Sequence, residues 1–314
     1  MNKNKISNGL KFLITGGAGF IGSHIAEKLI KQDRGEVVVF DNLSVGQKEN
    51  IPQGCQFIQG DIRNKTEITK AIGGVDIIFH DAAFVSIRKS FDKLEEEFEN
   101  NCLGTLNVLR AAEKNKVKKI IFASSMAVYG QPEKLPVSEN HKTQPNSPYG
   151  LSKLRGEIYC QIFAKNTGLK YTILRYFNTY GIKQTPSDYV GVTTIFINQA
   201  LNQKPMTIFG DGKQTRDFVW VEDIAEANLL AAFSDKQGIY NIGSGNQISI
   251  NELAVGIKKE LGGEIVYQEA PGGEIDHIEA DISKAQKELA YQPKGDFFKI
   301  LPEIIKWWQE NKYK

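Results

Sequence analysis

A tyrosine and a lysine four residues apart, Tyr149 and Lys153, follow a serine pair, Ser124 and Ser125, that ends an apolar segment. Side chains at this spacing on a helix project from the same face, so the Lys153 ammonium can lie beside the Tyr149 phenol. A nearby cation lowers the pKa of a tyrosine from its usual value near ~10 toward neutrality. We therefore expect Tyr149 to exchange a proton with a substrate hydroxyl. The same spacing also arises by chance on amphipathic helices.

A glycine-rich segment near the N-terminus, residues 15–22, follows a short apolar run at 12–14. Its glycines allow a tight turn, close approach of the backbone to a pyrophosphate, and close packing of the helix that follows. A second apolar run ends in Asp41, about twenty residues beyond the glycines. An acid there can accept both ribose hydroxyls of NAD and repels the 2′-phosphate of NADP. The pattern predicts NAD, although a turn residue that caps a strand is the alternative for Asp41.

The later apolar runs also end in residues that could do chemistry. Residues 56–59 end in Gly60-Asp61, residues 75–80 end in Asp81-Ala82-Ala83, and residues 119–123 end in the serine pair. Short apolar strands that alternate with helical segments are typical of an open parallel sheet, which binds its ligand at the carboxyl ends of the strands. The sequence predicts an α/β fold with a Rossmann-like, doubly wound parallel sheet.

Composition sets further bounds on the class of protein. The chain has 314 residues and a formal net charge of +2, which favours neither a nucleic-acid nor a membrane partner. Cys55, Cys102 and Cys160 lack metal-ligand spacing, so we expect buried thiols, no metal site and a reducing cytoplasm. The polar first nine residues and the interrupted apolar run behind them indicate neither a signal peptide nor a membrane span.

Six motifs in order along the chain resemble one family. They are TGGAGFIG at 15–22, SSMAVYG at 124–130, YGLSK at 149–153, LRYFNTYG at 174–181, GDGKQTRDF at 210–218 and YNIGSG at 240–245. Together they resemble the extended short-chain dehydrogenase/reductases, within the NAD-dependent epimerase/dehydratase family. The chain is most similar to the branch that contains the UDP-glucose 4-epimerases.

The resemblance implies two lobes. Residues 1–178 would form the NAD-binding Rossmann domain, with later strands near 217–222 and 239–242 returning to it. Residues 179–314 would form mainly a smaller C-terminal lobe that binds the nucleotide sugar.

The resemblance also implies roles for individual residues. Tyr149 would be the catalytic base, Lys153 its electrostatic partner, and Ser125 the group that hydrogen-bonds O4 of the sugar. The implied cofactor residues are Gly16, Gly19, Phe20, Ile21, Gly22, Asp41, Asn42, Ser44, Gly46, Asp61, Ile62, Ala82, Ala83, Ser124, Tyr149, Lys153 and Tyr176. The implied substrate residues are Ser86, Arg88, Ser125, Tyr149, Asn178, Thr207, Phe209, Arg216, Glu274 and Ile278.

Two of these assignments carry alternatives. Ser124 could instead cap the end of its strand, and Arg88 could form a surface salt bridge. The family pattern has an arginine three residues before Glu274, where this chain has Pro271. Either Arg88 compensates for the missing cation or the nucleotide is not UDP.

The residues after Ser125 bear on the type of reaction. Related dehydratases carry acids at the positions of Met126 and Ala127, because elimination of water needs an additional acid/base, and the decarboxylase branch keeps one of them. Both residues are apolar here. The resemblance therefore implies a UDP-hexose 4-epimerase that works through a transient 4-keto sugar and tightly bound NAD. The alternatives are a UDP-glucuronate 4-epimerase, a dehydratase or reductase, and a non-catalytic NAD-binding regulator.

Two finer expectations follow from the resemblance. Helices near 101–113 and 149–163 would form a homodimer interface through Leu103, Leu106, Leu109, Leu154, Ile158 and Ile162, with core packing as the alternative. Ile278 stands where a bulky tyrosine excludes N-acetylhexosamines in related enzymes. We expect isoleucine there to admit UDP-GlcNAc and UDP-GalNAc as well as UDP-glucose and UDP-galactose.

Overall fold

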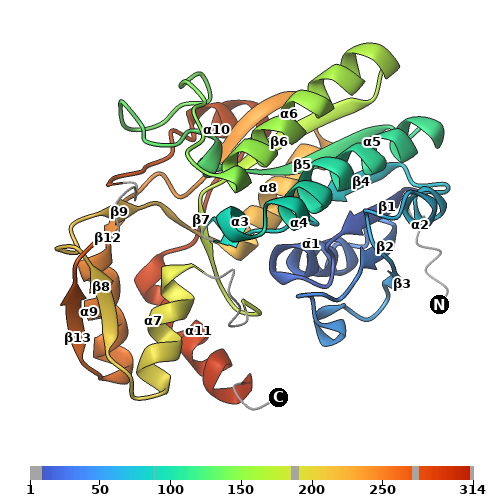
Figure 1. Cartoon of the computed structure of the whole chain (residues 1–314). Coiled ribbons are helices and arrows are strands. Elements are labelled where there is room, and N and C mark those ends of the chain that lie inside the picture. Colours follow the sequence, from blue (N-terminus) through green and yellow to red (C-terminus); the bar gives the residue numbers. More distant parts are fainter. Residues whose placement is uncertain (1–8, 88, 185–190, 271–275, 312–314) are drawn as a thin grey trace.

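The computed structural model describes residues 9–87, 89–184, 191–270 and 276–311. Its centre is a parallel sheet of seven strands in the order β11-β6-β5-β4-β1-β2-β3 (Figure 1). The strands are β1 Lys11–Thr15, β2 Glu36–Asp41, β3 Gln56–Gln59, β4 Ile77–His80, β5 Lys119–Ser125, β6 Lys170–Tyr176 and β11 Gly238–Ile242. Every neighbouring pair in this sheet is parallel. The predicted doubly wound fold is confirmed.

The central strands are apolar on both faces because helices cover both faces. Phe12 and Ile14 pack into one hydrophobic cluster and Leu13, between them, packs into another. The first cluster contains side chains from α1 Phe20–Lys31, α8 Val221–Phe233 and α10 Ser283–Leu289. The second contains side chains from α2 Lys65–Ala71, α5 Thr105–Lys114 and α6 Pro148–Thr167. The sheet is thus the middle layer of three.

The chain reverses its direction of travel across the sheet between β1 and β4, which lie side by side. From β1 it continues to β2 on one side, and from β4 to β5 on the other. The carboxyl ends of these two strands therefore form the switch point where open α/β sheets bind dinucleotides. Short helical elements follow three of the strands. After β2 comes η1 Lys48–Asn50, and after β5 comes η3 Met126–Val128. After β4 come α3 Lys89–Asp92, α4 Leu94–Phe98 and the π-helical η2 Glu99–Gly104.

A third hydrophobic cluster forms the core of a smaller lobe, which lies to one side of the sheet (Figure 1). Its elements include α7 Val192–Leu201, β8 Met206–Phe209, α9 Ile250–Leu261, β13 Ile265–Gln268 and α11 Phe297–Asn311. Strands β8 and β13 pair in parallel, and β9 Thr215–Arg216 pairs with β12 Ile248–Ser249 in antiparallel fashion.

The two strands expected to return to the first lobe behave differently. β11 does pair with β6 in the central sheet. The strand expected near 217–222 is β10 Phe218–Trp220, which pairs instead with β7 Asn178–Tyr180 in a separate two-stranded sheet. Residues after Trp220 begin α8, whose apolar side chains pack into the central core. The lobe boundary at residue 178 stays a prediction.

Two of the leucines expected at a dimer interface serve the core instead. Leu109 is fully buried under the sheet, and Leu154 packs against the main cluster. Leu103, Ile158 and Ile162 are exposed. The helical repeat of 3.6 residues therefore places only some of the expected interface residues on the outer face of the two helices. None of the helices in the described parts of the chain is long and apolar enough to cross a membrane.

Candidate active site and cofactor site

Helix α6 carries the two residues with which we began. It starts at Ser147, whose side chain accepts a hydrogen bond from the Gly150 amide (3.1 Å), and Pro148 occupies the first turn. A Cβ on Gly150 would lie 2.4 Å from the carbonyl oxygen of Ala127, and a Cβ on Gly156 would lie 2.3 Å from the Phe122 ring. The absence of side chains at these two positions lets α6 pack directly against η3 and β5.

The three predicted catalytic side chains lie together at the carboxyl end of β5. The Ser125 hydroxyl lies close enough to the Tyr149 phenol to lower its pKa. The Lys153 ammonium lies 5.9 Å from the centroid of the Tyr149 ring and donates a hydrogen bond to the Ala123 carbonyl (2.8 Å). Tyr149 and Lys153 are both buried. The arrangement offers a phenol, a hydroxyl and a cation to one reacting hydroxyl group.

The expectation that the pKa of Tyr149 falls toward neutrality is wrong for this arrangement. Burial raises the pKa of Tyr149 well above its usual value, and the charges of Asp81 and Glu97 add to that effect. The Ser125 hydroxyl opposes the rise in this pKa but does not cancel it. Burial also lowers the pKa of Lys153 to about 8. The effect of burial on the pKa of Tyr149 is thus larger than that of the Lys153 cation. The Lys153 ammonium donates its hydrogen bond to the Ala123 carbonyl instead.

Ser124 has a structural role in addition to the one expected at the cofactor, which stays a prediction. Its hydroxyl donates a hydrogen bond to Glu157, 2.5 Å away, one turn beyond Lys153 on α6. Glu157 also receives two hydrogen bonds from the Arg175 guanidinium on β6, of 2.8 and 2.6 Å. This buried ion pair joins α6 to β5 and β6 directly beneath the catalytic side chains. Ser124 therefore contributes to the support of the site.

The glycine loop has the geometry of a pyrophosphate cradle. Gly16 has a φ of +73°, and a Cβ there would lie 2.7 Å from the Ala82 amide nitrogen. A Cβ on Gly22 would lie 2.3 Å from the Gly16 carbonyl oxygen, so α1 can start this close to the loop only with glycine. The N-cap of α1, Gly19, supplies no side-chain cap, so no side chain of that residue competes for the first-turn amides of Phe20 and Ile21.

Asp41 lies at the end of β2, beside this loop. Its carboxylate accepts hydrogen bonds from the Ala18 amide (3.0 Å) and the Leu43 amide (2.8 Å). Burial raises its pKa. A carboxylate has about four acceptor positions, so two remain for ribose hydroxyls. Asp41 thus fits the predicted role at the ribose and also holds the glycine loop. Gly46 packs against Asp41 and Ala18.

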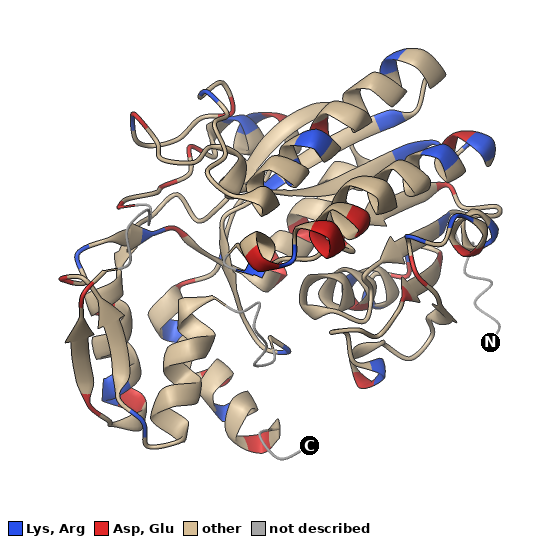
Figure 2. Cartoon of the chain, viewed as in Figure 1, with Lys and Arg blue, Asp and Glu red and all other residues tan. Residues whose placement is uncertain are grey.

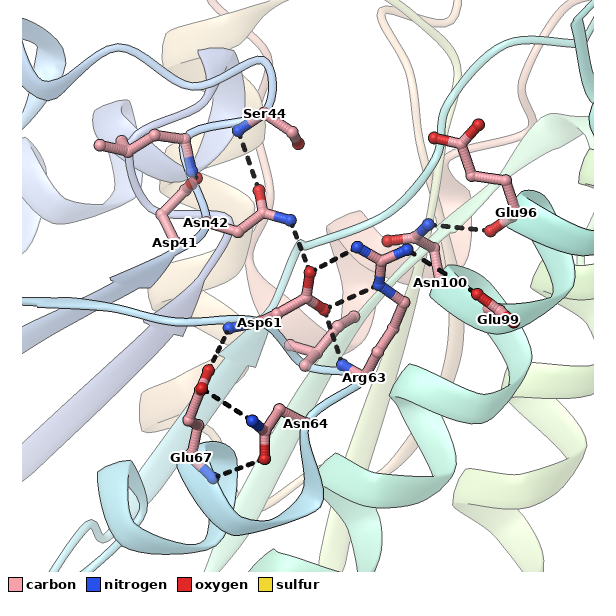
Figure 3. Close-up of polar contacts among 12 residues, drawn as sticks. Asp41, Asn42, Ser44, Asp61, Arg63, Asn64, Glu67, Glu96, Glu99 and Asn100 are labelled. Carbon is pink, nitrogen blue, oxygen red and sulfur yellow. Dashed lines mark hydrogen bonds and ion pairs between the residues drawn. The ribbon is translucent and has the colours of Figure 1, made fainter.

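Asp61, at the end of β3, lies in the polar cluster of Figure 3. It accepts hydrogen bonds from Asn42 (3.0 Å) and from two nitrogens of the Arg63 guanidinium (3.0 and 2.7 Å). Arg63 lies 3.8 Å from Glu99 on η2. The hydrogen bonds from Arg63 lower the pKa of Asp61 to about 2, so Asp61 is an anion at neutral pH. The side-chain oxygen of Asn42 in turn accepts a hydrogen bond from the Ser44 amide.

Of the other expected cofactor residues, some are partly exposed at the carboxyl end of the sheet and others are buried in the core. Ala82 and Ala83, after β4, are partly exposed, and the Ala82 amide donates to the Thr15 hydroxyl (3.3 Å). Ile62 is buried in the core beneath α5. The Tyr176 hydroxyl is buried and hydrogen-bonded to the Asn228 amide group.

Two acids near the catalytic group were given no role in the sequence analysis. Asp81 follows β4, where its amide donates to the Thr15 carbonyl (3.2 Å), and burial raises its pKa to about 7. Glu97, on α4, is buried and accepts a hydrogen bond from Asn101 (2.8 Å). The signal for Asp81 was present, because it follows β4 directly at the edge where Ala82 was assigned to the cofactor. Glu97 lies within an acidic run whose other members face solvent, so no pattern distinguished it.

The expected substrate residues come from both lobes. Asn178 lies on β7 and Arg216 on β9, with Thr207 and Phe209 on β8 and Ser86 in the segment after β4. The side-chain oxygen of Asn178 is buried without a hydrogen-bond partner among the described residues, so it can accept a hydrogen bond from a ligand. Arg216 donates to the Thr215 carbonyl (2.8 Å). Arg88, Pro271 and Glu274 lie outside the described residues.

Ile278 lies deeper than expected. It has no solvent exposure and packs in the main hydrophobic cluster. The segment around it is tied to the first lobe, because the Val137 amide donates to the Glu279 carbonyl (2.8 Å) and the Asp281 amide donates to the Val137 carbonyl (2.9 Å). The role of Ile278 in selecting the sugar stays a prediction. Among the residues that the structure describes, no cluster of His, Cys, Asp and Glu could hold a metal ion.

Comparison with known proteins identifies the family. Residues 12–243 match the model of the NAD dependent epimerase/dehydratase family. A putative UDP-glucose 4-epimerase of Methanocaldococcus jannaschii is 44% identical over 95% of this chain and 98% of its own length. The chain belongs to the NAD dependent epimerase/dehydratase family.

Solved structures agree with this assignment. The structure of UDP-glucose 4-epimerase from Thermotoga maritima with UDP-glucose is 35% identical, with a TM-score of 0.93, over 96% of this chain and 100% of that one. The UDP-N-acetylglucosamine 4-epimerase of Methanobrevibacter ruminantium, in complex with UDP-N-acetylmuramic acid, is 36% identical, with a TM-score of 0.91, over 96% and 99%. The predictions of an enzyme of this family and of NAD as cofactor are confirmed.

Proposed function

We propose that this enzyme is a UDP-hexose 4-epimerase that inverts C4 through a transient 4-keto sugar. One observation carries the proposal: Tyr149, Ser125 and Lys153 lie together at the carboxyl edge of the sheet that also carries the dinucleotide cradle. The three similar proteins described above bear epimerase names, which supports the same reaction class.

The residues divide the chemistry among them. Tyr149 takes the proton of the sugar O4 hydroxyl and later returns it, and Ser125 shares the hydrogen bond that orients that hydroxyl. The Lys153 cation stabilises the phenolate while Tyr149 is deprotonated. Bound NAD supplies the acceptor and donor of hydride at the sugar carbon, and it ends each turnover in its starting oxidation state.

The residues after Ser125 favour epimerisation over elimination of water. Met126 and Ala127 form the start of η3, and both are apolar and buried. Neither can protonate or deprotonate a second position of the sugar. A 4-keto sugar in this site is therefore left with the return of hydride as its outcome.

We propose UDP as the nucleotide carrier, held at its diphosphate by Asn178 and Arg216. A guanidinium offers paired donors to phosphate oxygens, and the side-chain nitrogen of Asn178 is a further donor. For the sugar, we propose both plain and N-acetylated hexoses, because isoleucine at position 278 lacks the ring that would fill the acetamido space. We further propose that two copies associate through the exposed apolar residues of α4, η2 and α6.

The test is conversion of UDP-glucose and of UDP-N-acetylglucosamine by purified protein without added NAD. We expect the galacto epimer of at least one substrate to form, detected by proton NMR, until the two epimers reach equilibrium. Net oxidation or reduction of the cofactor, or loss of water from the sugar, would instead assign a different reaction to the site.

A further inference from the structure

Asp217 lies between β9 and β10, directly after Arg216, and is fully buried. Its carboxylate accepts two hydrogen bonds from Ser244, one from the amide (2.7 Å) and one from the hydroxyl (2.8 Å). It accepts two more from the amides of Gly245 (3.0 Å) and Ala280 (3.1 Å). A carboxylate has about four acceptor positions, so the protein itself uses the hydrogen-bonding capacity of this group. Asp217 can therefore act on a ligand only through the residues around it.

The four donors belong to segments of the first lobe. Ser244 and Gly245 follow β11, an edge strand of the central sheet, and Ala280 packs in the main hydrophobic cluster. Gly243 allows these segments to meet, because a Cβ there would lie 2.6 Å from the Ala280 side chain and 2.7 Å from the Asp217 carboxylate. The Asp217 carboxylate thus ties the connection between β9 and β10 to the first lobe.

The backbone of Asp217 is joined to both residues that were proposed to hold the diphosphate. Arg216 precedes it directly in the chain. The backbone amide of Asn178 donates a hydrogen bond to the Asp217 carbonyl (3.0 Å), and Asn178 lies opposite Phe218 in the pairing of β7 with β10. The relative placement of Arg216 and Asn178 is therefore set at Asp217.

We propose that Asp217 is a positioning residue of the substrate site, whose carboxylate fixes the Arg216 guanidinium and the Asn178 side chain at the spacing of one nucleoside diphosphate. This inference rests on the assignment of these two residues to the diphosphate under the proposed function. A guanidinium binds two phosphate oxygens at once only in a narrow range of distances and angles. A backbone held at a buried anchor keeps it within that range.

Asp217→Asn removes the anchor while preserving the shape of the side chain. The asparagine amide has one oxygen, so its NH2 group must face donors that the carboxylate satisfied. We expect the Kd for UDP, measured by calorimetry on the NAD-loaded full-length enzyme, to rise about tenfold. The KM for the UDP-sugar should rise with it and kcat should change little, because binding of substrate and transition state weakens equally. A merely structural residue would instead lower the amount of active enzyme, and so kcat, at an unchanged KM.

A double-mutant cycle with Arg216→Gln shows whether Asp217 acts through Arg216. Loss of the guanidinium should raise the Kd for UDP about 10- to 100-fold. Once the guanidinium is gone, its position no longer matters. The double variant should therefore bind UDP more tightly than the product of the two single losses predicts.

Asp223→Asn is the matched control. Asp223 is a second buried carboxylate close in sequence, and it also accepts backbone hydrogen bonds, from the amides of Lys294 (3.0 Å) and Gly295 (2.8 Å). Neither partner was assigned to the substrate. This variant should lower the melting temperature but leave the Kd for UDP and the KM unchanged.

Ser244→Ala covers the case in which Asp217→Asn does not fold. It removes one of the four donors, the Ser244 hydroxyl, and leaves the carboxylate in place. We expect a smaller rise in the Kd for UDP, of about two- to fivefold, in a folded protein.

Three results would overturn the proposal: an unchanged Kd for UDP in folded Asp217→Asn, fully multiplicative losses in the double variant, or, where Asp217→Asn does not fold, an unchanged Kd in Ser244→Ala. The binding measurements need no turnover, so they remain decisive if the proposed epimerase reaction fails. If the unmodified protein binds dTDP or GDP in place of UDP, the same cycle applies with that nucleotide and only the proposed carrier is wrong. Failure to bind any of the three would overturn this proposal and the assignment of the diphosphate site together.

Discussion

Tyr149 and Lys153 are neighbours whose pKa values burial shifts in opposite directions. A neutral phenol and a neutral amine are both favoured by enclosure, so the pKa of the tyrosine rises and that of the lysine falls to about 8. The base therefore gains its reactivity from interactions that stabilise the phenolate, and the nearby Ser125 hydroxyl supplies one of them.

Replacement of Tyr149 by phenylalanine removes that hydroxyl and little else. We expect kcat to fall by about 10² to 10⁴, the usual contribution of an acid-base group, while the fold and NAD binding persist. Steady-state rates, circular dichroism and NAD content would be compared with the unmodified protein. Turnover near the unmodified level would remove Tyr149 from its assigned role.

The pH dependence should report the ammonium of Lys153. Below pH 8 the side chain is charged, and as the pH rises through about 8 the charge is lost, so kcat/KM should fall above that pH. Lys153→Met should turn over slowly and lack this falling limb. A kcat/KM that stays constant from pH 7 to pH 9.5 in the unmodified protein would contradict the assignment.

At the scale of elements, α6 serves two surfaces. Its inner side packs on β5 and carries the catalytic residues, while Leu151, Ile158 and Ile162 on its outer side are 40%, 46% and 50% exposed. Leu94 and Phe98 of α4 and Leu103 of η2 are exposed as well. Acidic residues border this surface on α4, whose ribbon is largely red in Figure 2. An apolar surface of this kind marks a site of association.

A charged residue in this surface should therefore disrupt the proposed dimer. We expect Ile158→Lys to convert a dimer into a monomer at micromolar concentration, as measured by light scattering. Val255→Lys is the control, because Val255 is an equally apolar, exposed residue (60%) on α9 of the other lobe. A monomeric unmodified protein, or a dimer that survives Ile158→Lys, would count against this interface.

The sequence predicted these elements unevenly, for physical reasons. The strands could be predicted because buried parallel strands are continuous apolar runs. The glycine loop could be predicted because the spacing of its glycines follows from steric limits near Gly16 and Gly22. The structural role of Ser124 could not be predicted, because it depends on contacts with Glu157 and Arg175, which are distant in sequence. The pKa of Tyr149 depends on burial in three dimensions, which a four-residue spacing does not specify.

At the scale of the molecule, the C-terminal segment connects the lobes. Ala280 forms a bridge with Val137, and Ile278 and Ala280 both belong to the main core of the first lobe. Ile278, the residue predicted to select the sugar, therefore packs against side chains of the Rossmann domain. The resemblance to the family assigned Ile278 to the sugar site but could not tell how deeply its side chain lies.

Ile278→Tyr tests whether this position selects the sugar. Overpacking a filled site costs typically ~1–3 kcal/mol, so we expect lower stability and a drop of about 5- to 150-fold in the ratio of kcat/KM for UDP-GlcNAc over UDP-glucose. Ile278→Leu, which preserves volume, should change the ratio little. An unchanged ratio in a folded Ile278→Tyr protein would show that Ile278 does not shape the sugar site.

The proposed reaction is tested most directly by turnover of UDP-glucose in heavy water without added NAD. If hydride leaves C4 and returns to it within the closed site, UDP-galactose should form with its original hydrogen at C4 and no change in mass. Mass spectrometry and proton NMR report both quantities. Deuterium bound to a sugar carbon of the product, or loss of water from the sugar, would contradict epimerisation at C4 by this site.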